Sequence, residues 1–276
     1  MYNKITTLLL AVGSAVFLPG CGRTAVSGNG AEAVEASDSI PVAVKQLVRV
    51  VADNDSDGFA RIVSYPLQRP YPLHDIENEK EMSEYYHKLV DDSLRRTISS
   101  AGPDRWKEFG WRGWTLDDGQ YVWVNEKVYD VQYISQTEQK IIDSLTREEM
   151  SNIAPGIREG WRPTVCMIDS ASGKIYRVDK STAVKSTQNG PYRLVVYSKN
   201  DDLLGMPSEM YKGDKEEAGS LGVAAYRFSD EQGKDIMLEP DDPEEASPLL
   251  VMPDNSTVRL KRAYWHELVK NGKSRK

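Results

Sequence analysis

The N-terminal segment limits what this chain can fold into more than any other feature. The terminal amine and Lys4 form a short positive region, and an almost purely apolar run follows from Ile5 to Leu18. A positive end, an apolar stretch of this length and a small residue after it are typical of a secretory signal peptide. The run is too short to cross about 30 Å of hydrocarbon, which takes roughly 20 apolar residues. We therefore expect residues 1–20 to be removed after export.

The residues around the expected cleavage point, Leu18-Pro19-Gly20-Cys21, resemble a bacterial lipobox. Leucine, glycine and cysteine match that pattern, and Pro19 departs from it. An ordinary signal peptide with a coincidental cysteine is the alternative interpretation. The resemblance implies lipidation of Cys21 with palmitate-type acyl chains, and two such chains give the stable anchoring that one does not. Gly22 follows in place of an aspartate, which by resemblance to lipoprotein sorting implies the outer membrane of a diderm bacterium, facing periplasm or cell surface.

Cysteine usage and charge restrict the partners of the exported part. The chain has two cysteines, so lipidation of Cys21 leaves Cys166 without a disulfide partner, and we expect its thiol to be buried in a strand. A chain of this size can build a core without disulfides.

The net charge is −7, and the first basic run is the tail from Lys270 to Lys276. Such an acidic chain is not typical of nucleic-acid-binding proteins, so no nucleic-acid partner is expected.

Residues 21–39 predict a flexible tether. They are rich in glycine, alanine, serine and glutamate, and they show no apolar periodicity. A segment of this composition cannot bury enough apolar surface to fold alone. The membrane is therefore expected as a partner through the lipid anchor only.

Two helical patterns and a proline-rich stretch come next. Apolar residues at helical spacing predict a helix after Pro41 and a second, short helix capped by Ser56. Pro66, Pro70 and Pro72 then favour an extended, turning segment.

The clearest helix of the sequence begins after Asn78, which suits the N-cap position. Glutamates early and arginines late in the segment match the helix dipole. The apolar residues recur at three- and four-residue spacing, and these are Met82, Tyr85, Tyr86, Leu89, Val90, Leu94 and Ile98. We expect one continuous helix whose apolar face packs against a sheet.

Strand patterns dominate the rest of the chain. Aromatic, glycine-punctuated segments between residues 106 and 134 predict strands, with a hairpin turn at Asp118-Gly119. A helical pattern covers residues 138–153. Short strand patterns follow Trp161, and the polar loops between them are longest at residues 199–222.

These patterns predict an α+β chain with two domains. In residues 40–155, helices are expected to pack on a curved antiparallel sheet. Residues 162–270 are expected to form a β-rich small barrel or sandwich, with a frayed basic tail at 271–276. The boundary is expected between 155 and 162.

The order of elements in residues 40–135 resembles the nuclear-transport-factor-like (cone-shaped α+β) superfamily. The resemblance rests on Ser64-Tyr65-Pro66-Leu67, Asn78, Tyr85 and Gly110-Trp111-Arg112-Gly113, which look like uncharacterised exported bacterial members of that group. The resemblance implies a cone in which a curved sheet wraps the long helix and leaves an apolar pocket. Members include isomerases, dehydratases and non-catalytic domains, so the resemblance fixes no activity.

A ligand in such a cone would lie between the long helix and the sheet of residues 110–134. Tyr85, Trp114 and Trp123 are the aromatic residues expected to line this pocket, and a small apolar or carbohydrate ligand would suit them. Strand alternation leaves open, by one register step, which way the two tryptophans face.

The sequence contains three histidines, His74, His87 and His266. His74, Asp75 and His87 could serve acid–base catalysis in a cone pocket, as in the superfamily's dehydratases. Alternatively, His87 lies on the surface, and replacing His266 has little effect.

The sequence contains no His-x-His, HExxH or paired-cysteine spacing, so no metal and no cofactor are expected. Residues 53–58 resemble the start of a calcium loop, but the acidic twelfth position is replaced by Ser64.

The loop of residues 170–176, Ser-Ala-Ser-Gly-Lys-Ile-Tyr, resembles the inhibitory loop of bacterial envelope lysozyme inhibitors. Those proteins are small β-barrels that usually carry disulfides, which this chain cannot form. Common turn residues also explain so short a match.

The favoured function is therefore non-catalytic binding of a ligand or an envelope protein. The alternatives are an acid–base enzyme using His74, Asp75 or His87, and inhibition of a foreign hydrolase through residues 170–176.

Overall fold

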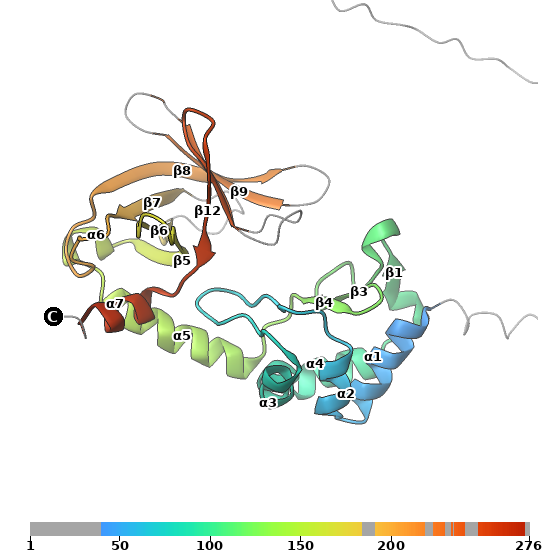
Figure 1. The fold of residues 1–276 in the computed structure, drawn as a ribbon. Helices are drawn as coiled ribbons and strands as arrows, with labels where there is room; N and C mark the ends of the chain where they lie inside the picture. The colour runs from blue at the N-terminus through green and yellow to red at the C-terminus, as the bar shows by residue number, and fades with distance from the viewer. Residues whose placement is uncertain are drawn as a thin grey trace, which may run out of the picture. The chain divides into compact units, whose positions relative to one another are not determined.

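Helices and antiparallel sheets make up the computed structural model of this chain (Figure 1). The fold is therefore α+β, as the sequence predicts. The structure describes residues 40–183, 191–218, 223–229, 233, 235–240 and 248–273. Cys21, the expected signal peptide and the expected tether lie outside these residues. Residues 39–276 form one compact unit, and the boundary expected between 155 and 162 stays a prediction. No described helix combines the length and apolarity needed to cross a membrane.

Four helices precede the first sheet, and polar side chains cap three of them. The helices are α1 (Val42–Ala52), α2 (Ser56–Arg61), α3 (Glu79–Leu89) and α4 (Asp92–Ser99). Asp55 accepts a hydrogen bond from the Gly58 N–H of α2, and Asn78 accepts one from the Glu81 N–H of α3. These caps satisfy N–H groups that have no partner within the helix.

The prediction of one continuous helix over residues 79–98 is wrong, because the chain breaks it at Val90. Val90 has φ −96° and ψ 87°, and Asp91 caps α4 by accepting hydrogen bonds from the N–H groups of Ser93 and Leu94. Tyr133 also donates to the Asp91 carboxylate. Desolvation disfavours the charged carboxylate, but these hydrogen bonds prevail and lower the pKa of Asp91. The break thus depends on partners that are distant in the sequence.

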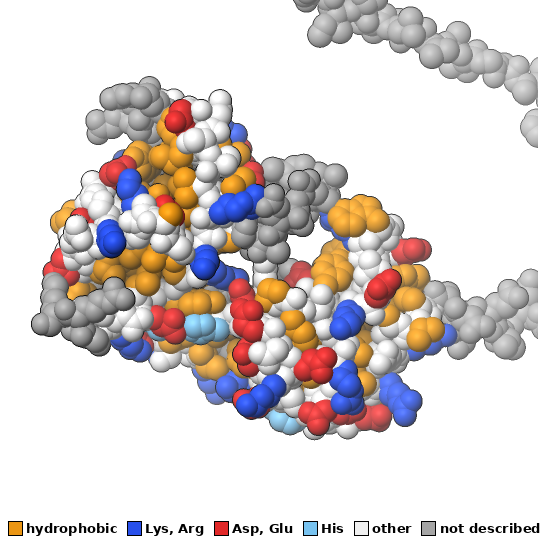
Figure 2. Space-filling model, viewed as in Figure 1, with side chains coloured by type: hydrophobic (Ala, Val, Ile, Leu, Met, Phe, Trp, Pro, Cys, Tyr) orange, Lys and Arg blue, Asp and Glu red, His pale blue; other side chains and the backbone are white. Residues whose placement is uncertain are grey.

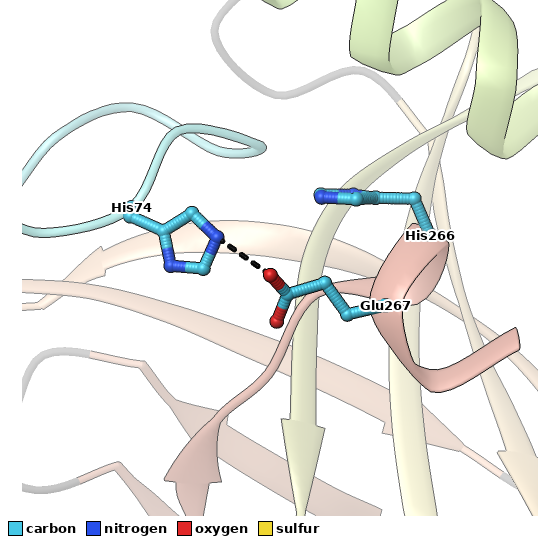
Figure 3. Close-up of side chains that lie close together, drawn as sticks. All are labelled: His74, His266 and Glu267. Atoms are coloured by element: carbon cyan, nitrogen blue, oxygen red, sulfur yellow. Dashed lines mark ion pairs between the residues drawn. The ribbon is translucent and has the colours of Figure 1, made fainter. Parts of the chain in front are cut away.

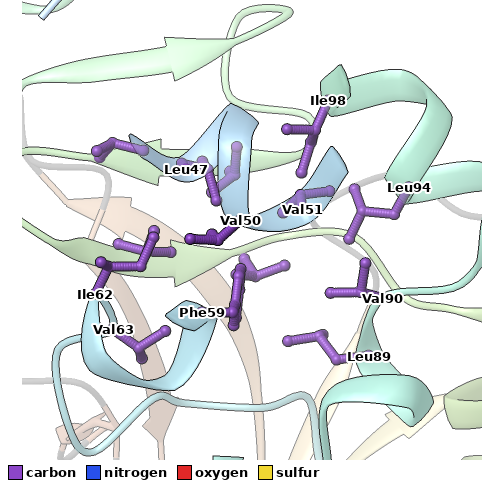
Figure 4. Close-up of a cluster of buried hydrophobic side chains, with 14 of the residues drawn as sticks. Leu47, Val50, Val51, Phe59, Ile62, Val63, Leu89, Val90, Leu94 and Ile98 are labelled. Carbon is purple, nitrogen blue, oxygen red and sulfur yellow. The ribbon is translucent and has the colours of Figure 1, made fainter. Parts of the chain in front are cut away.

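A four-stranded antiparallel sheet packs on these helices. Its strand order is β1-β2-β3-β4, with β1 (Trp106–Glu108), β2 (Trp114–Leu116), β3 (Val122–Val124) and β4 (Val128–Val131). Short 3-10 helices, η2 (Pro103–Arg105) and η3 (Gly110–Arg112), flank β1. Val122 and Val124 point into a core that α1 to α4 also line. Figure 4 shows part of this core, including Leu47, Phe59 and Leu89 from three of the helices. Burying these side chains drives the packing of helices on the sheet.

A second sheet follows α5 (Gln136–Ser151) and α6 (Pro155–Arg158). Within the described residues its order is β12-β11-β10-β9-β8-β7-β6-β5-β13, and every pair is antiparallel. The strands are β5 (Trp161–Ile168), β6 (Ile175–Ser181), β7 (Tyr192–Tyr197), β8 (Glu209–Ala218), β9 (Val223–Ser229), β10 (Asp235–Glu239), β11 (Leu249–Val251), β12 (Thr257–Arg259) and β13 (Lys261–Arg262).

One continuous segment nearly closes this sheet into a barrel. β12 pairs with β11, and two residues later β13 pairs with β5 at the other end of the strand order. Side chains that point inward form one core, including Leu194, Phe228 and Leu238. A second core, which includes Val195 and Tyr197 of β7, lies under α5, α6 and α7 (Trp265–Lys273).

Two predictions for this half of the chain are wrong. Residues 209–218 form β8 instead of a polar loop, because they pair with β7 and β9. The side chains of Lys212, Asp214 and Glu216, at alternate positions of this strand, are exposed. Gly213 lies opposite Phe228, where a Cβ atom would come within 2.7 Å of that ring. The predicted frayed tail begins too early, because residues 271–273 still belong to α7. This helix buries Trp265 and Val269.

A fully buried ion pair connects the proline-rich stretch to α5. Arg69 donates to both carboxylate oxygens of Glu138, at 2.9 and 2.8 Å, and neither side chain is exposed. Arg69 also donates to the carbonyl oxygens of Val131 and Tyr133. Glu138 belongs to the capping box of α5, so its carboxylate also accepts the Ser135 N–H.

Replacing Glu138 should therefore be among the most damaging single changes. The Glu138→Gln variant leaves the Arg69 guanidinium buried without a counter-charge, and we expect the free energy of unfolding to fall by about 3–5 kcal/mol. Urea denaturation measures this loss. Glu84→Gln, the same change at an exposed position of α3, should alter stability by less than about 0.5 kcal/mol. Equal stability of the two variants would contradict the assigned role of the pair.

Candidate metal centre

The proline-rich stretch is fixed against the C-terminal part of the chain. Asp75 accepts hydrogen bonds from the Arg69 N–H, at 2.9 Å, and from Arg262 of β13, at 2.7 Å. Arg262 also donates to the Arg69 carbonyl oxygen at 2.8 Å. The Asp75 N–H donates to the Tyr264 hydroxyl at 3.3 Å. These bonds hold His74, the neighbour of Asp75, next to the start of α7.

His74, His266 and Glu267 come together at this place. One potential ligand atom from each residue lies within 4.8 Å of those of the other two (Figure 3). His74 Nε2 is 3.0 Å from Glu267 Oε1, and both side chains are about half exposed. The His74 ring also packs on the ring of Tyr264, with centroids 3.8 Å apart. Figure 3 shows the His266 imidazole extending from α7 toward His74, beside Glu267.

A buried carboxylate fixes the ring of His266. Glu149 of α5 lies 2.9 Å from His266 Nδ1 and also accepts the His266 N–H at 3.3 Å. Both residues are buried. Because Glu149 engages Nδ1, the nitrogen left to bind a metal ion is Nε2. Metal-binding histidines commonly hold their second nitrogen against a carboxylate in this way, which sets the tautomer and the ring orientation.

Tyr71 supports Glu149 from the proline-rich stretch. Its hydroxyl donates to Glu149 Oε1 at 2.7 Å and accepts the Trp265 N–H at 3.3 Å. Burial, followed by nearby negative charges that include Glu149, raises the pKa of Tyr71 well above its ordinary value. Tyr71 therefore remains a hydrogen-bond donor at neutral pH, and it holds the carboxylate that orients His266.

Two imidazoles and one carboxylate form a donor set for divalent transition metals. Such ligands bind Zn²⁺ at about 2.0–2.2 Å, with a fourth position free for water or another ligand. His74 and Glu267 would need to shift slightly to reach these distances, and their exposure permits such a shift. His266, held by Glu149, supplies the fixed point of the site.

The sequence-predicted catalytic residues do not converge on one site. His74 contacts Glu267, whereas Asp75 pairs with Arg262. His87 is exposed on α3 and packs edge-on against the ring of Tyr86. The prediction that His87 is a surface residue is therefore confirmed, and no geometry in the described part of the chain supports an acid–base trio.

The three expected ligand-lining aromatic residues also lie apart. Tyr85 donates to Glu138 at 3.2 Å, and burial followed by the charge of Glu138 raises its pKa. Trp114 packs on the first core. Trp123 alternates with the inward-facing Val122 and Val124, so its side chain lies on the opposite face of the sheet. Core side chains occupy the space between this sheet and the helices, and a ligand-binding role for the three aromatic residues stays a prediction.

Three other sequence expectations have clear positions in the structure. Cys166 is buried in β5 as predicted, and burial raises the pKa of its thiol. Asp55 caps α2, which explains the resemblance to a calcium loop without an ion. Residues 170–174 form the turn between β5 and β6, in which Asp169 accepts the Ala171 N–H at 2.9 Å. The inhibitor role of this loop stays a prediction.

The site roles of His266, Glu267 and the orienting Glu149 were not predicted from the sequence. His266 is buried, which conflicts with the expectation that its replacement has little effect. The available signal was the periodicity of Trp265, Leu268 and Val269, which predicts a helix with a buried face. The pairing of His266 with His74 could not be inferred, because it depends on closure of the second sheet.

Comparisons with known proteins give no relative. No protein-family model, no curated protein and no solved structure matches this chain.

Replacing His266 should destabilise the protein even without metal. His266→Ala removes one of the two side-chain partners of the buried Glu149 carboxylate, the other being Tyr71. We therefore expect a loss of about 1–3 kcal/mol. His87→Ala, on the exposed face of α3, should change stability by less than about 0.5 kcal/mol. Urea denaturation in a chelator separates this effect from metal binding. Equal midpoints for the two variants would refute the role given to the Glu149–His266 contact.

Proposed function

We propose that this protein is a cell-envelope lipoprotein, anchored at Cys21, that binds a divalent transition-metal ion through His74, His266 and Glu267. The observation that carries the proposal is the buried contact between Glu149 and His266 Nδ1. This contact directs the other nitrogen of His266 toward two residues with metal-binding side chains. An ordinary surface cluster of charges would not need a buried carboxylate behind it.

The proposed role is binding, without turnover. His74 and Glu267 are about half exposed, so the bound ion would lie near solvent and not in a closed reaction chamber. The nearby hydroxyls of Tyr71 and Tyr264 already take part in hydrogen bonds that hold the backbone. The proposal thus follows the non-catalytic function expected from the sequence but replaces the expected organic ligand with a metal ion. The cone arrangement of residues 40–155 remains part of our proposal.

Metal binding can be tested with the tag-free protein and Zn²⁺ alone. We expect Zn²⁺ to stabilise the wild-type chain against unfolding by about 2.7 kcal/mol when its free concentration is 100 times Kd. Zn²⁺ should bind in a one-to-one ratio by titration calorimetry. His74→Ala and Glu267→Gln change exposed side chains, so both variants should fold normally and bind much more weakly.

His87→Ala is the matched control for these titrations, because it removes an exposed histidine elsewhere on the chain. It should bind Zn²⁺ with the wild-type affinity. Unchanged affinity in His74→Ala and Glu267→Gln, or an equal loss in His87→Ala, would exclude the proposed site.

The lipid anchor is tested separately. Cys21→Ser prevents acylation, and the tether contributes no residue to the described cores, so stability should be unchanged. We expect the wild-type chain to stay in the membrane fraction after a high-salt wash and the Cys21→Ser chain to be released. Retention of a Cys21→Ser chain from which residues 1–20 have been removed would argue against lipidation.

A further inference from the structure

Four aromatic side chains form an exposed group at one end of the first sheet. Trp111 is 74% exposed, Phe109 42% and Tyr129 38%. Trp123 connects them on the face opposite the core, with its ring centroid 5.4 Å from that of Phe109 and 6.4 Å from that of Tyr129. We call Phe109, Trp111, Trp123 and Tyr129 the aromatic tip. Figure 2 shows hydrophobic side chains projecting at the end of the molecule where Figure 1 labels β1.

The loop that carries the aromatic tip is held in one conformation. Gly113 has φ +82°, and a Cβ atom there would come within 2.4 Å of the Val124 carbonyl oxygen. The Phe109 N–H donates to the Gly113 carbonyl oxygen at 2.8 Å, and the Tyr129 hydroxyl donates to the Arg112 carbonyl oxygen at 2.9 Å. The exposure of Trp111 is therefore built into the fold. A rigid aromatic group loses little conformational entropy on binding.

We propose that the aromatic tip inserts into the headgroup region of the bilayer to which the chain is anchored. This inference rests on the lipidation of Cys21 in the proposed function. Residues 22–39 between that cysteine and the folded unit reach at most about 65 Å when fully extended. A random-coil chain of this length has a mean end-to-end distance of about 25 Å. The bilayer is thus the surface that the tip meets most often.

The composition of the aromatic tip matches a membrane–water interface. Tryptophan and tyrosine concentrate at the headgroup level of bilayers, and arginine places its charge in the same layer. The guanidinium of Arg112 lies over the indole of Trp111, 5.5 Å from the ring centroid. Nearby charges of opposite sign compensate each other, since Lys107 pairs with Asp118 at 2.7 Å. Binding should therefore depend on aromatic insertion and not on anionic lipids.

Flotation with phosphatidylcholine vesicles tests this inference. The Cys21→Ser chain made without residues 1–20 has neither the apolar signal segment nor the acyl chains. It binds vesicles only through the remaining surface, so the result does not depend on the anchor. We expect Trp111→Ala in this background to weaken vesicle partitioning at least about tenfold. Met206→Ala, which alters an exposed apolar side chain outside the tip, should leave partitioning within about a factor of two. Thermal melting confirms that both variants fold.

Equal partitioning of the Trp111→Ala and Met206→Ala chains would overturn the proposal. Absence of vesicle binding by their common Cys21→Ser parent would overturn it as well. Loss of binding when the salt concentration is raised would indicate charge attraction and overturn it as well. Binding of the tip to soluble oligosaccharides without vesicle binding would assign these residues to a glycan instead. Release of the wild-type chain from membranes by salt, with intact vesicle binding by the Cys21→Ser chain, would refute the anchor alone.

Discussion

The buried pair of Arg69 and Glu138 is the interaction on which the rest of the structure depends. Removing two charges from water is costly, and the cost is offset only when every donor and acceptor finds a partner. Here the Glu138 carboxylate binds Arg69, Tyr85 and the N-terminus of α5, and Arg69 also reaches two carbonyl oxygens at the end of β4. The backbone of Arg69 is bound separately to Asp75 and Arg262. One residue thus connects the first sheet, α3 and α5 to the barrel-like sheet.

A second buried charged group positions the other side of the metal centre. Asp179 of β6 binds both Arg177 and Arg193, and all three are buried. The excess positive charge faces indole rings, since Arg177 lies 4.4 Å from the ring centroid of Trp265 and Arg193 lies 4.4 Å from that of Trp161. Trp265 directly precedes His266. The group of Arg177, Asp179 and Arg193 therefore packs against the first residue of α7, whereas Glu149 of α5 orients His266 itself.

Local signals in the sequence predicted much of the fold and little of the site. Periodicity and turn residues predicted the α+β class, the cap at Asn78 and the strands around residues 170–173. The predicted cap at Ser56 is one residue off, because Asp55 caps α2. They failed where a residue depends on distant partners. Asp91 ends α3 only because Tyr133 and the start of α5 stabilise its carboxylate, and β8 is a strand only between β7 and β9. His74 and His266 have no common local motif, so their proximity was not visible before the fold was known.

The pairing of β12 with β11 and of β13 with β5 has a consequence for biogenesis. Residues 257–262 join the two ends of the barrel-like sheet, so β5 and β11 keep unpaired edges until almost the whole chain has been made. A chain truncated before residue 257 would present two open strand edges, and these are sites where aggregation begins. His266 and Glu267 follow directly after this closing segment. Metal binding at the proposed site would thus report that synthesis and closure of the barrel-like sheet are complete.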